Sequence, residues 1–251
     1  MPRAGTSSEI RVGAVTGSKR ERACLAHHHP EIEIRCSGAV PYRASALAAS
    51  LIDQGCAGLL SIGLAGGLDP ALKPGDVVVS STIIVPDGAK IRSDAAWRDR
   101  VAAELEESAI PFRIGAIAGL NELVRLAERK RALRSATGAL AVDMESHAVM
   151  QIAAAAGIPF LAVRVIADGA GDELPMAAES ALTEEGGVAI FRLLGALLRR
   201  PSDVFGMMIL ARRSAIGFRT FHRVASLAGL RRPRADAKSR KAGDRASVIG
   251  G

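Results

Sequence analysis

The feature that most constrains the fold is a series of short apolar runs that alternate with helical segments rich in alanine and leucine. The clearest run, residues 158–166, is mostly apolar and ends just before Asp168. Such runs are typical of parallel strands buried on both faces. Aromatic residues make up only 3% of the chain, so Ala, Val, Leu and Ile must build the core. The alternation predicts an α/β fold of three layers, with helices on both faces of a mixed, mostly parallel central sheet.

The expected elements follow one another through the first 200 residues. Strands are expected at 10–15, 58–62, 76–85, 139–142 and 159–166, with a glycine-rich turn at 63–67. Helices are expected at 18–26, 45–54, 95–107, 122–137, 146–156 and 187–198. We therefore predict one domain over residues 1–200 and a different segment over 201–251.

The second segment carries most of the positive charge. The net charge of the chain is +7, whereas residues from 199 onward hold 13 Arg and Lys against 3 Asp. A helical projection places two groups on opposite faces, apolar Met207, Leu210, Phe218, Phe221, Val224 and Ala225 against basic Arg212, Arg219 and Arg223. This pattern predicts a basic amphipathic helix, followed by a disordered tail from residue 231.

Two interpretations of this amphipathic helix stay open. Its apolar face packs on the body of the protein, or residues 205–232 bind an anionic membrane surface, with the apolar face in the interface. Nucleic acid is a less favoured partner, because the terminal basic residues lack aromatic side chains for stacking. Liposome flotation with and without the segment after Pro201 distinguishes the first two interpretations.

Cysteine and histidine positions argue against a metal or a disulfide framework. Cys24, Cys36 and Cys56 are odd in number and lack C-x-x-C spacing, so we expect reduced thiols and a cytoplasmic protein, at most peripheral at the inner face of the membrane. Three successive imidazoles at 27–29 cannot all face one ion, so we expect an exposed loop there. We expect no metal or redox cofactor. Inorganic phosphate is a candidate co-substrate.

Three separated segments resemble the purine nucleoside phosphorylase and methylthioadenosine nucleosidase superfamily. They are a strand and loop at 13–21, a glycine-rich segment at 63–76, and Val-Asp-Met-Glu at 142–145 with 163–168. The resemblance covers roughly residues 10–198 and implies a nucleoside substrate and a homo-oligomer. Finer features, at 36–43, 61–70 and 141–147, most resemble the hopanoid-associated phosphorylases. Those enzymes are implied to remove adenine from adenosylhopane, leaving ribosyl- or phosphoribosyl-hopane.

The resemblance assigns roles that the chemistry supports. Cleavage of a ribosyl C1′–N9 bond needs an acid that protonates purine N7, and Asp168, at the end of a buried strand, is the candidate. Glu145 is implied to accept hydrogen bonds from the ribose hydroxyls, with Met144 packed beneath the sugar. Glu21 matches the position where the hydrolytic branch holds its water. The resemblance also implies that backbone groups of the glycine-rich segment lie against purine and ribose. These groups belong to Ala65, Gly66 and Gly67.

Water and phosphate both remain candidate nucleophiles. Gly17, Arg20 and Arg43 are candidates for phosphate binding, but Glu21 would repel a phosphate, which favours water. Leu64 and Ala167 stand where the nucleosidase pattern has hydroxyl side chains, and a more apolar site would suit a hydrocarbon 5′ group.

Other interpretations compete with this assignment. The chain could be a soluble purine nucleoside phosphorylase, a methylthioadenosine/S-adenosylhomocysteine nucleosidase, or a non-enzymatic nucleoside-binding sensor. Taken singly, each carboxylate has a purely structural interpretation: Glu145 as a helix N-terminal charge, Asp168 as a turn residue and Glu21 as part of a solvated helix face.

Overall fold

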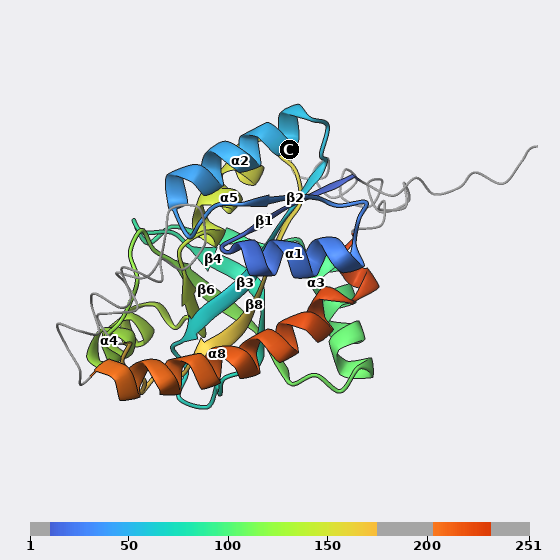
Figure 1. Cartoon of the computed structure of the whole chain (residues 1–251). Helices are drawn as coiled ribbons and strands as arrows, with labels where there is room; N and C mark the ends of the chain where they lie inside the picture. Colours follow the sequence, from blue (N-terminus) through green and yellow to red (C-terminus); the bar gives the residue numbers. More distant parts are fainter. Residues whose placement is uncertain (1–10, 175–202, 232–251) are drawn as a thin grey trace, which may run out of the picture.

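The computed structural model describes residues 11–174 and 203–231, and strands and helices alternate along most of them (Figure 1). The strands are β1 (Val12–Thr16), β2 (Glu33–Cys36), β3 (Gly58–Gly67), β4 (Val77–Ile84), β5 (Lys90–Arg92), β6 (Phe112–Gly119), β7 (Ala141–Asp143) and β8 (Phe160–Asp168). The helices are α1 (Lys19–His28), α2 (Pro41–Asp53), α3 (Ala95–Glu107), α4 (Ala127–Thr137), α5 (Ser146–Ala155) and α8 (Asp203–Ala225), with a 3-10 turn η1 (Ala228–Leu230).

The strands form one mixed sheet whose middle closes on itself. The pairs β1–β2, β1–β3, β3–β8, β4–β6 and β6–β7 are parallel, and β3–β7, β4–β5 and β4–β8 are antiparallel. Because β8 pairs with both β3 and β4, the strands β3, β8, β4, β6 and β7 form a ring. Irregularities in β3 at Ala65/Gly66 and in β4 at Ser80/Thr82 accompany the bending that closure requires. The predicted mixed, mostly parallel sheet is confirmed. The sequence analysis did not predict that five of its strands close into a ring.

Helices cover both faces of the sheet, which confirms the predicted three layers. Small and branched side chains of α2 and α5 pack with Val15, Leu59 and Phe160 on one face. On the other face, α1, α3 and α8 pack against side chains such as Ile62 and Val163. Figure 1 shows α2 and α5 on one side of the sheet and α1 and α8 on the other. The alanine-rich helices bring the layers close, as expected of a core with few aromatics.

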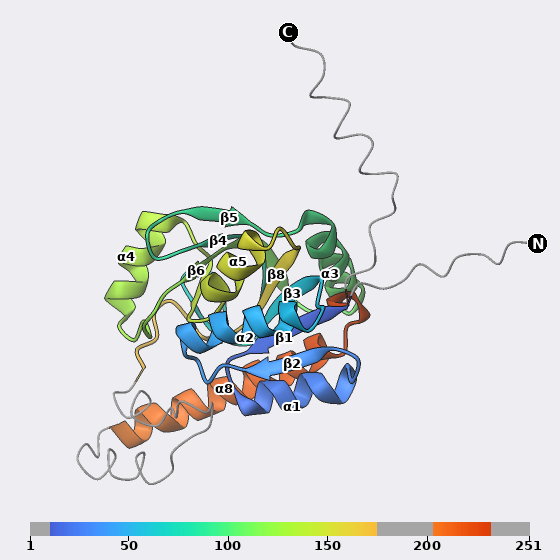
Figure 2. The ribbon, with the colours of Figure 1, turned by 90° about the horizontal axis from the view of Figure 1, so that it is seen from above.

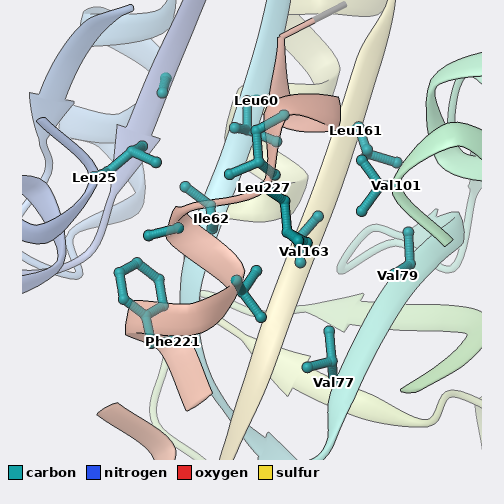
Figure 3. Packing of buried hydrophobic residues seen from close by; sticks show 14 of the residues in the cluster. Leu25, Leu60, Ile62, Val77, Val79, Val101, Leu161, Val163, Phe221 and Leu227 are labelled. Atoms are coloured by element: carbon teal, nitrogen blue, oxygen red, sulfur yellow. The ribbon is translucent and has the colours of Figure 1, made fainter. Parts of the chain in front are cut away.

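The last helix belongs to this core over its C-terminal half. Phe221, Val224 and Leu227 are buried in the cluster that also holds Ile62 and Val163, and Figure 3 shows Phe221 and Leu227 beside strand residues. Trp97 Nε1 also donates a hydrogen bond of 2.9 Å to the carbonyl of Gly229. This part of the predicted amphipathic helix therefore packs on its own sheet. While they are packed there, its buried apolar side chains are not available to a membrane interface.

Several sequence-based bounds are corrected by the structure. The expected turn at 63–67 continues strand β3, because Gly66 pairs with Val142 on one side and with Asp168 on the other. Strands β2, β5 and β6 were not anticipated. Helix α2 begins at Pro41 instead of 45, and α4 at Ala127 instead of 122. The helix predicted at 187–198 and the tail after 231 lie outside the described residues. Among the described helices, none is both long and apolar enough to cross a membrane.

Candidate active site

Asp168 ends strand β8 and lies almost wholly inside the protein, 6% exposed. Its Oδ2 accepts a hydrogen bond from the ammonium group of Lys130, a helix α4 residue with no exposed surface. Lys130 also donates to the carbonyls of Gly169 and Asp172, each at 2.9 Å. All three ammonium protons therefore have acceptors, which holds both the lysine and the carboxyl group of Asp168 in one orientation.

Two opposing effects set the proton affinity of Asp168. Burial raises the pKa of this carboxyl group, and the positive charge of Lys130 works against that rise. The raised pKa favours a carboxyl group that can hold a proton closer to neutrality than an exposed aspartate can. The hydrogen bond from Lys130 stabilises the carboxylate that remains once the proton has left. The pair is thus chemically suited to giving a proton to a bound molecule and recovering it.

Glu145 is the N-terminal cap residue of α5 and is buried beside an arginine that strand β8 supplies. Arg164 Nη2 lies 3.7 Å from Glu145 Oε2, while Arg164 Nε donates to Asp143. Arg164 also donates to Ser61 Oγ, so most of its donors are committed to groups other than Glu145. Burial raises the pKa of Glu145 to about 8, Arg164 opposes the rise, and the charges of Asp143 and Glu21 add to it.

Glu21 lies in the first turn of α1, inside the protein. Its Oε2 accepts from the backbone N–H of Ser18 at 2.7 Å, and the Ser18 hydroxyl accepts from the Glu21 N–H, forming a capping box. Its Oε1 accepts from the N–H of Leu64 at 2.8 Å, which joins α1 to β3. Burial raises the pKa of Glu21 despite these hydrogen bonds. The interpretation as a solvated helix face is therefore wrong for Glu21.

Gly17 lies between the two glutamates. A Cβ at this position would come within 2.7 Å of Glu145 Oε1 and 3.4 Å of Glu21 Oε2. Only a residue without a side chain leaves that space to the two carboxyl groups. The loop between β1 and α1 therefore brings Glu21 and Glu145 together, as the sequence-based assignment requires.

Asp168 shares one cavity with Met144, the residue implied to pack beneath the sugar. Met144 and Asp168 both line it, together with Gly66, Glu122, Leu123, Val124, Val142, Asp143 and Leu174. At Gly66 a Cβ would come within 3.3 Å of Asp168 Oδ2, so the glycine lets the backbone approach the acid. At Gly67 a Cβ would come within 3.2 Å of the Asp168 carbonyl oxygen, so this glycine also allows a close approach. The side chain of Ala65 packs in the core under α2 and α5, which leaves only its backbone for the site.

The residues predicted to bind phosphate are not brought together. Arg20 is exposed, and its guanidinium stacks on the ring of Phe218 in α8, 3.9 Å from the ring centroid. Arg43 lines a separate basic depression with Lys19, Arg22, Ile34, Arg35, Cys36 and Leu47. Gly17 remains beside the two buried glutamates. The three positions therefore form no common anion site in the described residues.

Sequence reasoning missed two buried cations. Arg164 could have been noticed in the sequence, because it is the only charged residue of the apolar strand Phe160–Asp168 before the terminal aspartate. A buried arginine needs a partner of opposite charge or a hydrogen-bond acceptor. Nothing in the sequence marks Lys130 as buried, because it stands in the charged segment Glu128-Arg-Lys-Arg131. His147 is a packed residue, bonded through Nε2 to Asn121 Oδ1 at 3.0 Å, as its usual structural role suggests.

Comparison with known proteins identifies the family. Residues 6–199 match the family model of the phosphorylase superfamily, and the chain belongs to that superfamily. A 5′-methylthioadenosine/S-adenosylhomocysteine nucleosidase of Marinomonas sp. (strain MWYL1) is 31% identical over 142 residues, which are 49% of this chain and 62% of the relative. The corresponding Staphylococcus aureus (strain JH9) nucleosidase is 25% identical over 141 residues. The chain thus spans about 62% of the length of these relatives.

Solved structures show the same fold. A Helicobacter pylori 5′-methylthioadenosine/S-adenosylhomocysteine nucleosidase, crystallised with butyl-thio-DADMe-Immucillin-A, has a TM-score of 0.63 and 20% identity. That match covers 76% of this chain and 99% of the other. A futalosine hydrolase mutant from the same organism has a TM-score of 0.58 and 20% identity, over 62% and 89% of the two chains. The likeness confirms the predicted α/β fold.

Proposed function

We propose that this protein is an enzyme that removes adenine from a 5′-substituted adenosine, with water as the nucleophile. One observation carries the proposal: a buried carboxyl group held by a lysine lines the same cavity as Met144, while Glu21 and Glu145 meet at Gly17. This arrangement combines an acid for the leaving base with carboxylates for the sugar and the water. A binding module would not need an acid in that environment.

The leaving base is protonated by Asp168. As the C1′–N9 bond breaks, its electron pair moves into the purine, and Asp168 gives its proton to N7 so that neutral adenine leaves. Lys130 engages Oδ2, which directs Oδ1 towards the base. The resulting carboxylate is stabilised by the Lys130 ammonium until it recovers a proton. Lys130 acts through Asp168 and is therefore a positioning residue.

The two glutamates act on the sugar and on the water that attacks it. Glu145 accepts hydrogen bonds from the ribose hydroxyls, and the partial negative charge on its carboxyl oxygens faces the positive charge that develops at C1′. Water adds to C1′ and gives a proton to Glu21, whose pKa burial raises, so its carboxylate accepts a proton more readily than an exposed glutamate does. Arg20 on Phe218 and Arg43 in a separate depression support water over phosphate, because a phosphate would need their charges.

The 5′ group is the finer part of the proposal. We propose a large hydrocarbon substituent, as in adenosylhopane, because Leu64 and Ala167 offer no hydroxyl where the nucleosidase pattern has one. A second candidate is the methylthioadenosine/S-adenosylhomocysteine nucleosidase reaction, which the names of the sequence relatives favour. A homo-oligomer, and membrane contact by the exposed part of residues 205–232, remain proposals.

Adenine release tests the proposal at three levels. The purified full chain is incubated with 5′-methylthioadenosine, S-adenosylhomocysteine and an adenosyl lipid, each with and without inorganic phosphate. Release that does not depend on phosphate, with free ribosyl product, is expected. A product that carries phosphate would replace water by phosphate, and preference for a small 5′ group would replace the lipid. Binding without release from any substrate would favour the nucleoside sensor.

A further inference from the structure

Helices α1 and α8 bring one thiol and two imidazoles together away from the cavity of Asp168. Cys24, His28 and His222 place one ligand atom each within 4.8 Å of one another. Cys24 and His28 are four residues apart on α1 and so share a face of that helix, and His222 reaches them from α8. Figures 1 and 2 both show α1 and α8 side by side.

The spacing of the two imidazoles fits a shared metal ion. His28 Nε2 lies 3.4 Å from His222 Nδ1, and the ring planes are almost perpendicular, at 89°. In a tetrahedral zinc site with Zn–N bonds of about 2.0–2.1 Å, two ligand nitrogens lie about 3.3 Å apart. The observed separation therefore matches that of two nitrogen ligands of one ion, and it also allows a long direct hydrogen bond between the rings when no ion is bound.

The chemistry of the three side chains selects the class of ion. One thiolate with two imidazoles suits zinc and similar borderline or soft transition metals, whereas magnesium and calcium prefer oxygen ligands. Each imidazole offers one ring nitrogen as a ligand atom, and the thiol offers its sulfur. Binding of the ion by Cys24 replaces the thiol proton and releases that proton to solvent.

The sequence-based expectation of no metal rested on the succession of residues 27–29 and on the lack of C-x-x-C spacing among the cysteines. In the structure these residues end α1 instead of forming an exposed loop, and the rings of His27 and His28 meet edge-on with their centroids 5.0 Å apart. His29 is buried and contacts Glu31 at 3.1 Å, and His27 is not among the three clustered ligands. Only His28 joins the cluster, and its partners come from one turn earlier in α1 and from a helix nearly 200 residues away.

We propose that Cys24, His28 and His222 bind one zinc-class transition-metal ion, with a fourth position open to solvent. The ion would fasten α1 to α8. Helix α1 holds Glu21 in its first turn, and α8 packs by Gly217 against the carbonyl of Ile166, two residues before Asp168. Metal binding would therefore stabilise two elements that support the candidate active site, without contacting the substrate.

Cobalt spectroscopy of the full chain tests this proposal. After treatment with a chelator, the protein is titrated with Co²⁺, and then with Zn²⁺ as competitor. The expected result is one Co²⁺ per chain, with visible bands of a tetrahedral site and a thiolate-to-cobalt absorption band that Zn²⁺ abolishes. At a Zn²⁺ concentration about 100 times Kd, we expect the unfolding midpoint to rise by about 5–10 °C.

Matched variants decide whether this cluster is responsible. Cys24→Ser should abolish the thiolate band, and His222→Gln should weaken Co²⁺ binding by at least about tenfold. His27→Gln, a neighbouring exposed histidine of the same helix, should leave both unchanged. The metal-free unfolding midpoints of all three variants verify folding. A thiolate band that survives Cys24→Ser, or binding lost equally in His27→Gln, would overturn the proposal, as would a wild-type titration without bands.

Discussion

Arg164 lies 3.7 Å from Glu145 yet does not hold it as a carboxylate, because the arginine is bonded to Asp143 and Ser61. Burial therefore prevails, and the pKa of Glu145 rises to about 8. An unfolded chain loses this proton near the ordinary glutamate value, whereas the folded chain keeps it to higher pH. Between about pH 4.5 and pH 8 the folded state binds more protons, so this group lowers stability as pH rises.

Glu145→Gln should remove that pH dependence. The amide has no proton to retain, so the free energy of unfolding should fall less between pH 5 and pH 8 than in the wild type. At pH 8 we expect the variant to be more stable by on the order of 1 kcal/mol or more. Chemical denaturation at several pH values measures this, with the exposed Glu106→Gln as control. Parallel curves for wild type and Glu145→Gln would show that Glu145 is ionised throughout.

Asp168→Asn should lower kcat by about 10²-fold or more, because an amide can donate a hydrogen bond to N7 but not a proton. KM should change little, since the side chain keeps its shape and its contact with Lys130. Steady-state adenine release gives both constants. Near-native turnover in this variant would assign the acid to another group.

Lys130→Met should shift the pH profile of the reaction. Without the ammonium group, burial acts on Asp168 with less opposition, so the pKa of that carboxyl group should rise further. The alkaline limb of the kcat/KM profile, which reports loss of this proton, should move up by about one pH unit or more. Asp172 and Arg213 also act on Asp168, with opposite signs, and both are unchanged in the variant.

A second readout distinguishes this effect from simple unfolding. An unpaired buried carboxylate is expensive, so Lys130→Met should be less stable at pH 8 than at pH 5, where Asp168 can be protonated. If the rate falls equally at every pH and the limb does not move, Lys130 has only a structural role.

The fold was predictable from sequence wherever apolar runs were long. β8, β4 and α3 were placed within two residues at either end, because their patterns are periodic or continuous. β6 was missed because Phe112–Gly119 contains two glycines and an arginine, and only its pairing with β4 and β7 makes it a strand. The same long-range pairing turns the glycine-rich end of β3 into strand, which local propensity cannot reveal.

The site was predictable where a motif carried it. Glu145, Asp168 and Glu21 came from the resemblance, and the structure buries all three. Arg20 and Arg43 stay candidates for phosphate binding from the sequence alone. In the structure the guanidinium of Arg20 lies on the ring of Phe218 in α8, and Arg43 lines a separate depression. Lys130 could not be found, since its contact with Asp168 joins residues that are 38 positions apart and no pattern links them.

Gly17→Ala should impair the site without disturbing the rest of the fold. The new methyl group would lie 2.7 Å from Glu145 Oε1, so that carboxyl group must move. We expect KM to rise and kcat/KM to fall by roughly tenfold or more, because misplaced groups lose orientation. Gly171→Ala is the matched control, since no heavy atom lies within 4 Å of its Cβ. Equal activity of the two variants would mean that Glu145 does not contact substrate from this position.

Phe221→Ala decides whether α8 is part of the body or a separate membrane arm. Phe221 is fully buried against strands that lead to the site, so its truncation should lower the free energy of unfolding by about 3–5 kcal/mol. Met208 lies on the same helix but is 65% exposed, and Met208→Ala should change stability by less than about 0.5 kcal/mol. Thermal and urea unfolding measure both.

The opposite pattern would restore the membrane interpretation. If Phe221→Ala left stability unchanged but reduced flotation with anionic vesicles, the apolar face of α8 would have to leave the sheet and enter the interface. Because Gly217 packs against the Ile166 carbonyl of β8, such a departure would also loosen the strand that carries Asp168. Adenine release by the wild type should then change when anionic vesicles are added, whereas a helix that stays packed predicts no change with a water-soluble substrate.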